Sequence, residues 1–324
     1  MKIVIVTPAG ARTRHGNRHT AARWAVLLRG LGHHIAIQRS WDGAPADVMI
    51  ALHARRSHDS AVRFKRVCPD RPLVLALTGT DLYRDIHADA DARESMRVAD
   101  RMIVLQDMGR EELPPTLRGK TRVVYQSARA VRVQARLKSC FEVVVSGHLR
   151  EEKDPFRTAA ALQHLPAASR IRVAHLGAAM SEEMAREARQ WMAREPRYRW
   201  LGELPHGRAQ RRLARGRLMV ISSRMEGGAN VVSEALAAGV PIIASRISGN
   251  IGMLGRDYSG YYPLENEKAL GQLLWRAESD AAFYRRLKAQ CAARRPLVDP
   301  QREARSLRQL IADLDGKYVK SRRP

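Results

Sequence analysis

Short hydrophobic runs rich in β-branched residues alternate along this chain with longer segments of helical period. In the first half, the runs that predict strands cover residues 3–7, 34–38, 48–52, 73–77, 101–105 and 121–125. Helical segments lie between most of them, and the clearest covers residues 19–31 and ends before Gly32. This alternation predicts a parallel sheet with helices on both faces.

The second half begins the same pattern again. Its predicted strands cover residues 141–146, 170–176, 198–201, 218–222 and 241–245. Residues 127–139 are charged and poor in large hydrophobic residues, which predicts a linker, and the chain is almost wholly helical from Glu267 onward. We therefore expect an α/β protein with two doubly wound, Rossmann-like domains facing a cleft, over residues 1–139 and 140–300, followed by a C-terminal helix and basic tail over residues 301–324.

The length and the hydrophobic content agree with two globular domains. A chain of 324 residues exceeds what one hydrophobic core usually serves, and 45% of its residues are hydrophobic. No stretch approaches the ~20 hydrophobic residues that span a bilayer, and the short run that follows Met1 is typical of a first strand and not of a signal peptide. We expect a cytoplasmic protein without stable membrane insertion.

The charge is strongly positive, with 57 Lys and Arg against 33 Asp and Glu and a net charge of +24. Such a field attracts anions of every size. The excess is spread along the whole chain and only 5% of residues are aromatic, which disfavours a nucleic-acid partner. Cys68, Cys140 and Cys291 lie far apart without metal-ligand spacing, so we expect no disulfide framework, no metal and no other cofactor.

The strongest chemical motif covers residues 225–241 and follows a predicted strand. Gly227 and Gly228 allow backbone N–H groups to approach a ligand, and the helix that starts near Asn230 presents the positive end of its dipole to a phosphate. Glu226 and Glu234 flank this anion site and can accept hydrogen bonds from sugar hydroxyls. The alternative is a capping carboxylate and a surface residue.

This motif resembles the E-x7-E signature of the retaining family-four glycosyltransferases of the GT-B type. The resemblance implies that Glu226 contacts the transferred sugar and Glu234 the nucleotide ribose. Residues 143–155 resemble a second motif of the same family, in which an Arg and a Lys neutralise the donor pyrophosphate. Lys153 matches, but His148 stands where the Arg is expected and Arg150 follows two residues later. Residues 200–204 resemble the loop that brackets the nucleotide base, although a Trp there is also typical of core packing.

In the first half, residues 7–20 form a small-residue loop after the first strand, where doubly wound sheets bind ligands. Residues 77–83 follow another hydrophobic strand, and Asp81 is a candidate general base or acceptor-positioning carboxylate, with a helix N-cap as the alternative. The predicted donor-binding residues are Gly16, Asn17, His148, Arg150, Lys153, Glu226, Gly227, Gly228, Ala229, Asn230 and Glu234, the predicted acceptor-binding residues are Arg18, Thr20, Thr78, Gly79 and Thr80, and the predicted catalytic residues are Glu226, Lys153 and Asp81.

Residues 6–8, 16–24, 77–83 and 249–263 together resemble one branch of these enzymes, the selenosugar synthases of selenoneine biosynthesis. That resemblance implies UDP-N-acetylglucosamine (UDP-GlcNAc) or UDP-glucose as donor, selenophosphate as acceptor, a new carbon–selenium bond and a downstream enzyme that uses the selenosugar. An anionic acceptor requires cations, and Arg12, Arg14, Arg18 and Arg84 lie on or beside the two loops of the first domain.

Three alternatives stay open at this point. A hexosyltransferase acting on a lipid or glycan hydroxyl would use the basic surface to bind an anionic membrane. A non-catalytic polyanion-binding protein would keep the fold without the chemistry, and the presence of both Glu226 and Glu234 argues against it. A UDP-sugar 2-epimerase shares the fold as well.

Overall fold

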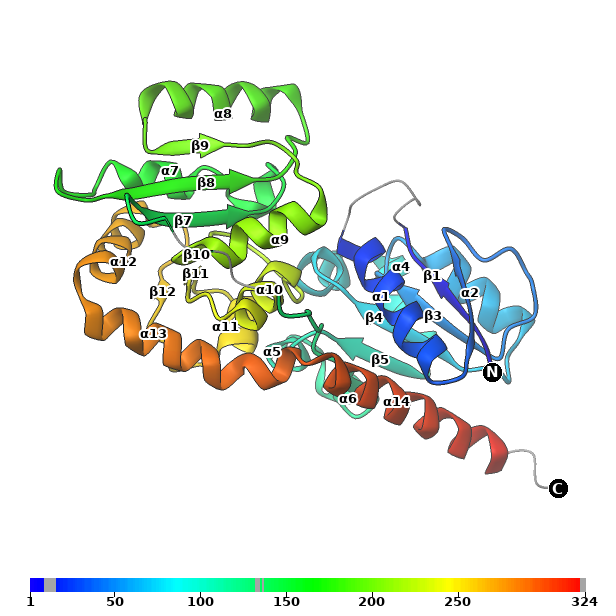
Figure 1. Ribbon diagram of the computed structural model, residues 1–324. Coiled ribbons are helices and arrows are strands. Elements are labelled where there is room, and N and C mark those ends of the chain that lie inside the picture. Colours follow the sequence, from blue (N-terminus) through cyan, green and yellow to red (C-terminus); the bar gives the residue numbers. More distant parts are fainter. Residues whose placement is uncertain (9–15, 132–134, 136, 321–324) are drawn as a thin grey trace. The chain divides into compact units, whose positions relative to one another are not determined.

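The computed structural model describes residues 1–8, 16–131, 135 and 137–320. The chain divides into two compact units (Figure 1). The first unit contains Met1–Gln126 and Pro300–Pro324, and the second contains Ser127–Asp299. The N-terminal part of the first unit thus ends at Gln126, directly before the charged segment over residues 127–139.

The first unit is built on a parallel sheet of six strands in the order β2-β1-β3-β4-β5-β6. Its strands are β1 (Lys2–Val6), β2 (His34–Gln38), β3 (Val48–Leu52), β4 (Leu73–Leu77), β5 (Arg101–Val104) and β6 (Thr121–Val123). Its helical elements are α1 (Gly16–Gly30), α2 (His58–Val67), the π-helical turn η1 (Asp81–Asp85), α3 (Ile86–Ala88), α4 (Ala90–Val98), α5 (Met108–Glu111), α6 (Pro115–Arg118) and α14 (Pro300–Lys320).

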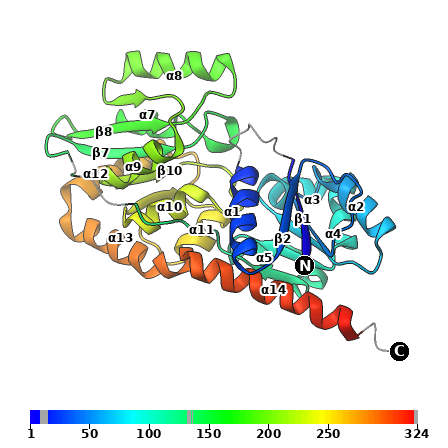
Figure 2. The ribbon, with the colours of Figure 1, turned by 45° about the vertical axis from the view of Figure 1, so that its right-hand side comes forward.

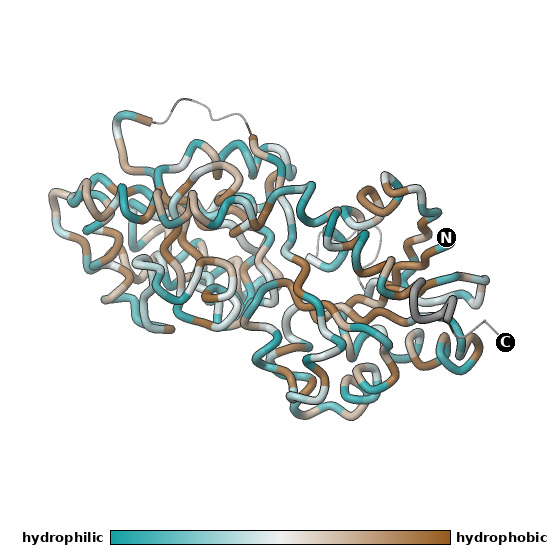
Figure 3. Tube along the Cα trace, turned by 90° about the horizontal axis from the view of Figure 1, so that it is seen from below, coloured by the Kyte–Doolittle hydropathy of each residue, from teal (hydrophilic) through white to brown (hydrophobic). Residues whose placement is uncertain are grey.

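Both faces of the inner strands β1, β3, β4 and β5 are largely buried, which explains why these strands are hydrophobic runs, whereas the edge strand β2 is partly exposed. Successive side chains of a strand point to opposite faces, so Val4 and Leu75 pack with residues of α2 and α4, whereas Ile5 and Val74 pack with residues of α1 and α14. Hydrophilic and hydrophobic stretches alternate along the trace, as amphipathic helices on buried strands require (Figure 3).

Helix α14 is an integral part of the first unit, although it comes last in the sequence. It lies beside α1 (Figures 1 and 2). Its residues Leu307 and Leu310 are buried in the same cluster as Trp24 of α1. The Trp24 indole also donates a hydrogen bond of 2.7 Å to Glu303. The C-terminal helix expected over residues 301–324 is thus present, but it packs as a wall of the first core.

The second unit is built on another parallel six-stranded sheet, in the order β12-β11-β10-β7-β8-β9. Its strands are β7 (Phe141–Ser146), β8 (Ile171–Leu176), β9 (Tyr198–Trp200), β10 (Leu218–Ile221), β11 (Ile242–Ser245) and β12 (Tyr261–Tyr262). Its helical elements are the 3₁₀ turn η2 (Glu151–Lys153), α7 (Arg157–Leu162), α8 (Glu182–Arg194), α9 (His206–Arg215), α10 (Asn230–Ala238), α11 (Ser248–Leu254), α12 (Glu267–Ser279), α13 (Ala281–Arg294) and the 3₁₀ turn η3 (Arg295–Val298).

The order of each sheet defines where a ligand is expected. In the second unit the chain runs from β7 outward to β8 and β9, and then returns to place β10 on the other side of β7. In the first unit the same reversal lies between β1 and β3. Doubly wound sheets bind ligands at the carboxyl ends of the strands beside such a switch point, so the loops after β7, β10, β1 and β3 are the relevant ones.

The predicted fold class, α/β with two doubly wound Rossmann-like halves, is confirmed. The sequence pattern missed β12, a strand of only two residues at the sheet edge. Within the described part of the chain, no helix combines the length and the hydrophobicity that crossing a membrane requires.

Candidate active site

Glu226 lies in the loop after β10, at the switch point of the second sheet, and is only 7% exposed. Its Oε1 atom accepts hydrogen bonds from Nζ of Lys153 and from Oγ of Ser223, the latter at 2.6 Å. Its Oε2 atom has no partner among the described residues. One carboxylate oxygen is therefore held by the protein and the other can accept a hydrogen bond from a substrate hydroxyl.

Lys153 reaches Glu226 from the neighbouring loop, after β7. It ends the turn η2, and the next residue, Asp154, has a left-handed backbone with φ of 44°. The Ser222 hydroxyl, at the end of β10, lies 3.0 Å from the Lys153 carbonyl oxygen and 2.8 Å from that of Asp154, so it binds both. Non-glycine residues in the left-handed conformation persist only where their surroundings hold them. Here the contacts with the Ser222 hydroxyl hold the backbone of Lys153 and Asp154, and with it the point from which the Lys153 side chain extends.

A glycine of α11 allows the Glu226 loop to take its position. A Cβ atom on Gly249 would lie 1.9 Å from the carbonyl oxygen of Glu226, closer than any real contact. The first turn of α11 therefore touches the backbone of the Glu226 loop. This close approach explains why a glycine stands in the motif at residues 249–263.

His148 and Arg150 hold different positions in the loop after β7. The Ala178 N–H donates to Nδ1 of His148 at 3.1 Å, so a neutral imidazole carries its proton on Nε2, which can donate to a phosphate oxygen. The Arg150 Nε atom is buried without a hydrogen bond to any described residue, and Oε2 of Glu152 lies 4.0 Å from it. Both side chains keep a donor for an anion, but only the Arg150 guanidinium is always charged.

His175 of β8 connects the loop after β7 to β9, and the sequence pattern did not single it out. Its ring donates from Nε2 to the Gly147 carbonyl oxygen at 3.2 Å, and its Nδ1 accepts from the Tyr198 hydroxyl at 2.8 Å. Gly177 lies beside this bond, where a Cβ would come within 2.0 Å of the Gly147 oxygen. Complete burial lowers the pKa of His175 to about 4, so the ring is neutral. In the sequence it is one polar residue within a strand run, which carries no functional signal.

The helix α10 begins where the motif predicted, and its N-cap is Ala229, which has no side-chain oxygen to cap the first turn. Gly227 and Gly228 precede it, and Asn230 is its first residue. Glu234, one turn further on, is contacted by Gln210 at 3.4 Å and by His206 at 3.8 Å, both from α9. The two glutamates of the motif therefore have different surroundings.

Trp200 is partly buried at the end of β9. Its indole donates to the Gly177 carbonyl oxygen at 2.8 Å, and its ring packs against the cluster of Leu149, Phe156 and Ala188. These contacts favour the packing alternative for this residue.

In the first unit, Asp81 is fully buried. Its Oδ1 accepts the N–H groups of Thr78 and Gly79 at 2.9 and 2.8 Å, and its Oδ2 accepts that of Ala54 at 3.0 Å. Both oxygens are thus engaged in joining the loop after β3 to the loop after β4. This geometry favours a structural role for Asp81 over the role of general base.

Thr80 contacts His53, a second residue that the sequence pattern did not single out. Its hydroxyl lies 3.1 Å from Nε2 of His53, which directly follows β3, is buried and has a φ of 78°. Desolvation by burial lowers the pKa of His53. Its Nε2 also lies 3.8 Å from Oδ2 of Asp85. A histidine at the end of a buried strand beside the switch point is the signal that could have pointed to it.

The remaining predicted residues of the first unit lie at the start of α1. Gly16, Asn17 and Arg18 form its first turn. Thr20 is buried, and its hydroxyl donates to the Gly16 carbonyl oxygen at 3.1 Å and accepts from Gln126 at 2.5 Å, which favours a structural role. Arg12 and Arg14 lie outside the described residues.

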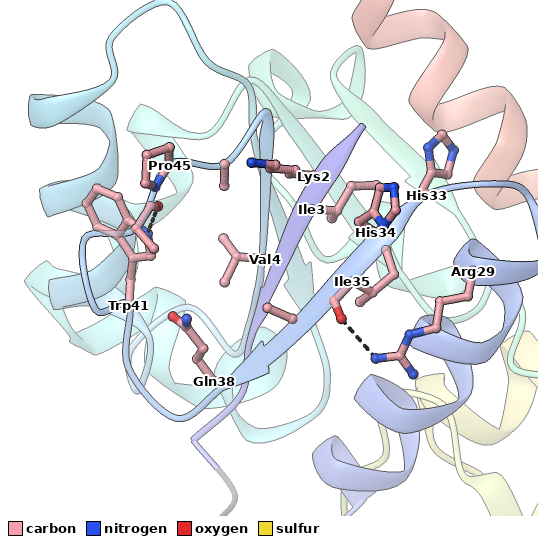
Figure 4. A pocket seen from close by; sticks show the side chains of 13 residues that line it. Lys2, Ile3, Val4, Arg29, His33, His34, Ile35, Gln38, Trp41 and Pro45 are labelled. Atoms are coloured by element: carbon pink, nitrogen blue, oxygen red, sulfur yellow. Dashed lines mark hydrogen bonds between the residues drawn. The ribbon is translucent and has the colours of Figure 1, made fainter.

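A cavity of about 510 Å³ lies on the first unit, away from all of these residues. It is lined by residues of β1 and β2 and by Trp41 and Pro45 of the loop that follows β2 (Figure 4). Lys2, Arg29 and His34 also line it. None of the predicted site residues does. In the part of the chain that the structure describes, no group of three or more His, Cys, Asp or Glu side chains could hold a metal ion.

Two doubly wound parallel units, with a glutamate, a lysine and a glycine-rich helix start at the switch point of the second, define the GT-B class of glycosyltransferase. The chain belongs to the family described as "Glycosyl transferases group 1", whose profile matches residues 130–294, about half of the sequence. The prediction of a glycosyltransferase enzyme is confirmed at this level. A comparison with curated protein sequences finds no match.

Solved structures of the same fold include Alr3699/HepE of Anabaena in complex with UDP and glucose, with a TM-score of 0.77, 15% identity and coverage of 97% of this chain and 100% of the other. Sucrose-phosphate synthase of Thermosynechococcus elongatus has a TM-score of 0.78, 15% identity and coverage of 97% and 99%. An α,α-trehalose-phosphate synthase (UDP-forming) of Burkholderia vietnamiensis has a TM-score of 0.69, 13% identity and coverage of 96% and 80%. At these identities the similarity establishes the fold.

Proposed function

We propose that this chain transfers a hexose, N-acetylglucosamine or glucose, from its UDP-sugar to selenophosphate and forms a carbon–selenium bond. The observation that carries the transfer is the Glu226 carboxylate at the switch point, with Oε1 held by Lys153 and Ser223 and Oε2 open to a sugar hydroxyl. The choice of UDP is supported by the similar proteins, of which Alr3699/HepE was solved with UDP and glucose. The choice of selenophosphate rests on the four sequence motifs that resemble selenosugar synthases.

In the proposed reaction, the selenium atom of selenophosphate bonds to the anomeric carbon while the bond from that carbon to the pyrophosphate oxygen breaks. The electron pair of the broken bond leaves with UDP. Water then cleaves the selenium–phosphorus bond, which releases inorganic phosphate and leaves the selenium on the sugar. Selenium in the acceptor is already anionic, so the attack needs no strong base, in agreement with the engaged oxygens of Asp81.

The residues of the second unit supply the stabilisation that this reaction needs. Negative charge builds on the pyrophosphate as the bond breaks, and the Lys153 ammonium and the Arg150 guanidinium lie in the loop that precedes α7. Glu234 on α10 is assigned to the ribose hydroxyls of the nucleotide. The cytoplasmic location, the independence from metal and a downstream selenosugar-using partner belong to the same proposal.

Mass spectrometry of the purified protein incubated with UDP-GlcNAc and freshly prepared selenophosphate tests the proposal. We expect free UDP together with a sugar product that carries the selenium isotope envelope, and neither of them with the Glu226→Ala variant. Release of UDP without selenium on the sugar would contradict the acceptor and leave a hydroxyl-directed glycosyltransferase. Conversion of the UDP-sugar to its 2-epimer without any acceptor would indicate the epimerase.

A further inference from the structure

The loops after β3 and β4 of the first unit share two unusual backbone features. His53, the first residue after β3, has a φ of 78°, which is rare for a residue other than glycine. The loop after β4 continues into the π-helical turn η1, Asp81–Asp85. Strained backbone and π-helical turns both occur preferentially at functional sites. Both features lie at the carboxyl edge of the sheet, next to the switch point between β1 and β3.

At this edge, Asp85 orients two arginines. Its carboxylate is 4% exposed, its Oδ2 lies 3.2 Å from Nε of Arg55, and its Oδ1 lies 3.1 Å from Nε of Arg84. The two arginine side chains are themselves 42% and 50% exposed. Arg84 donates a hydrogen bond from Nε to Oδ1 of Asp85, whereas Oδ2 of Asp85 has no hydrogen bond to any described residue and meets Arg55 only as an ion pair. The terminal amino groups of both arginines have no hydrogen bond to any described residue.

The two loops that carry these arginines are fastened to each other. Asp81 binds backbone N–H groups of both loops, and His53 of one loop contacts Thr80 of the other. The backbone positions that carry Arg55 and Arg84 are therefore held relative to each other by contacts within the first unit. With a single carboxylate between two guanidinium groups, the pair retains a net positive charge, and both arginine side chains are about half exposed.

We propose that Arg55 and Arg84 form a subsite for a tetrahedral oxyanion and that this subsite holds the phosphate-type group of the acceptor. Paired guanidinium groups match the oxygen atoms of such a group through several charged hydrogen bonds, which lysines cannot do. The inference rests on the proposed function in one respect, because it names where the anionic acceptor of that reaction binds. The presence of the anion subsite itself is independent of the sugar and of selenium.

Titration of the full-length protein with inorganic phosphate, followed by ³¹P NMR line broadening, tests this subsite. Saturating UDP is present to occupy the nucleotide site, and UDP affinity is measured in parallel. We expect the single variants Arg55→Gln and Arg84→Gln each to weaken phosphate binding by about ten-fold or more, with UDP affinity unchanged. Arg56→Gln is the matched control, because Arg56 is the exposed neighbour of Arg55 in the same loop, and we expect a change of less than about two-fold.

Each single variant leaves Asp85 with one arginine, so its buried carboxylate keeps a partner. Thermal unfolding of each variant checks that it remains folded. If Arg55→Gln and Arg84→Gln bind phosphate with the same affinity as Arg56→Gln, the proposal that Arg55 and Arg84 form an oxyanion subsite is wrong. Loss of phosphate binding in a protein that makes no selenosugar would support the subsite and reject the proposed function. If the protein does make selenosugar, we expect the same two variants to raise the KM for selenophosphate and to leave the KM for UDP-sugar unchanged.

Discussion

Lys153 donates a hydrogen bond from Nζ to Oε1 of Glu226, although 73 positions separate the two residues in the sequence. The sheet order brings them together, because Lys153 follows β7, Glu226 follows β10, and these strands are neighbours at the switch point. Ser223 donates to the same oxygen. The second oxygen of Glu226 can therefore accept a hydrogen bond from a substrate. Glu234 differs, because it is contacted by Gln210 and His206 of α9.

We therefore predict that Glu226→Ala and Glu234→Ala fail in different ways. Glu226→Ala should lower kcat by about 100-fold or more and change the Kd for UDP by less than about three-fold, because its contact matters most as the glycosidic bond breaks. Glu234→Ala should weaken UDP binding by about ten-fold and leave kcat within about three-fold, because a charged hydrogen bond to the ribose is lost. Steady-state kinetics and calorimetric UDP titration measure both.

Glu183→Ala serves as the control for this pair, because Glu183 is an exposed residue of α8. It should leave both quantities unchanged. The reverse pattern, in which Glu226→Ala mainly weakens UDP binding and Glu234→Ala mainly lowers kcat, would refute the assignment of the two glutamates.

Gly249→Ala should inactivate the enzyme although it removes no polar side chain. Its new Cβ would meet the carbonyl oxygen of Glu226 at 1.9 Å, so the Glu226 loop must move away from Lys153. We expect kcat to fall by about 100-fold, since small misplacements of a catalytic group are costly. Gly30→Ala is the matched control: nothing lies within 4 Å of the new Cβ at the end of α1. Full activity of Gly249→Ala would show that the loop tolerates the shift and that this contact is unimportant.

Asp81→Asn distinguishes a structural residue from a general base. An amide cannot accept from Thr78, Gly79 and Ala54 at once, so a buried N–H group loses its partner. We expect the free energy of unfolding to fall by about 1–3 kcal/mol, as denaturant titration would measure. Transfer per folded molecule should stay within about ten-fold. Asp70→Asn is the exposed control and should change neither stability nor transfer. If Asp81→Asn stays folded but loses transfer by several orders of magnitude, Asp81 acts as the general base.

The strands could be predicted because every buried parallel strand is a hydrophobic run, whereas β12 escaped because two residues, Tyr261 and Tyr262, make no run. The place of α14 could not be predicted, since an amphipathic period defines a buried face and not its partner. Glu226 and Lys153 could be proposed from the sequence because their motifs have fixed spacing. His53, Asp85 and His175 were missed because each is a single polar residue, and its backbone angle, partners and burial exist only in the folded chain.

His175 predicts how stability depends on pH. Burial lowers its pKa to about 4 in the folded protein, against 6.5 for an exposed histidine. Between these values the unfolded chain binds a proton that the folded chain does not, so stability is fully present above pH 6.5 and declines as the pH falls toward 4. For a fully buried ring, this difference corresponds to about 3 kcal/mol. Urea denaturation at pH 7 and at pH 4.5 should show most of that loss.

Carboxylates and His53 titrate in the same direction, so the contribution of His175 is obtained by comparison with His175→Gln, whose amide can still donate to Gly147 and accept from Tyr198. The variant cannot gain a proton in the unfolded state, and its stability should therefore fall less between pH 7 and pH 4.5 than that of the wild type, by about 2 kcal/mol or more. Equal losses in the two proteins would mean that His175 accepts a proton in the fold. In that case the Gly147 carbonyl would lie beside an imidazolium, and the assignment of His175 as a neutral ring that connects the loop after β7 to β9 would be wrong.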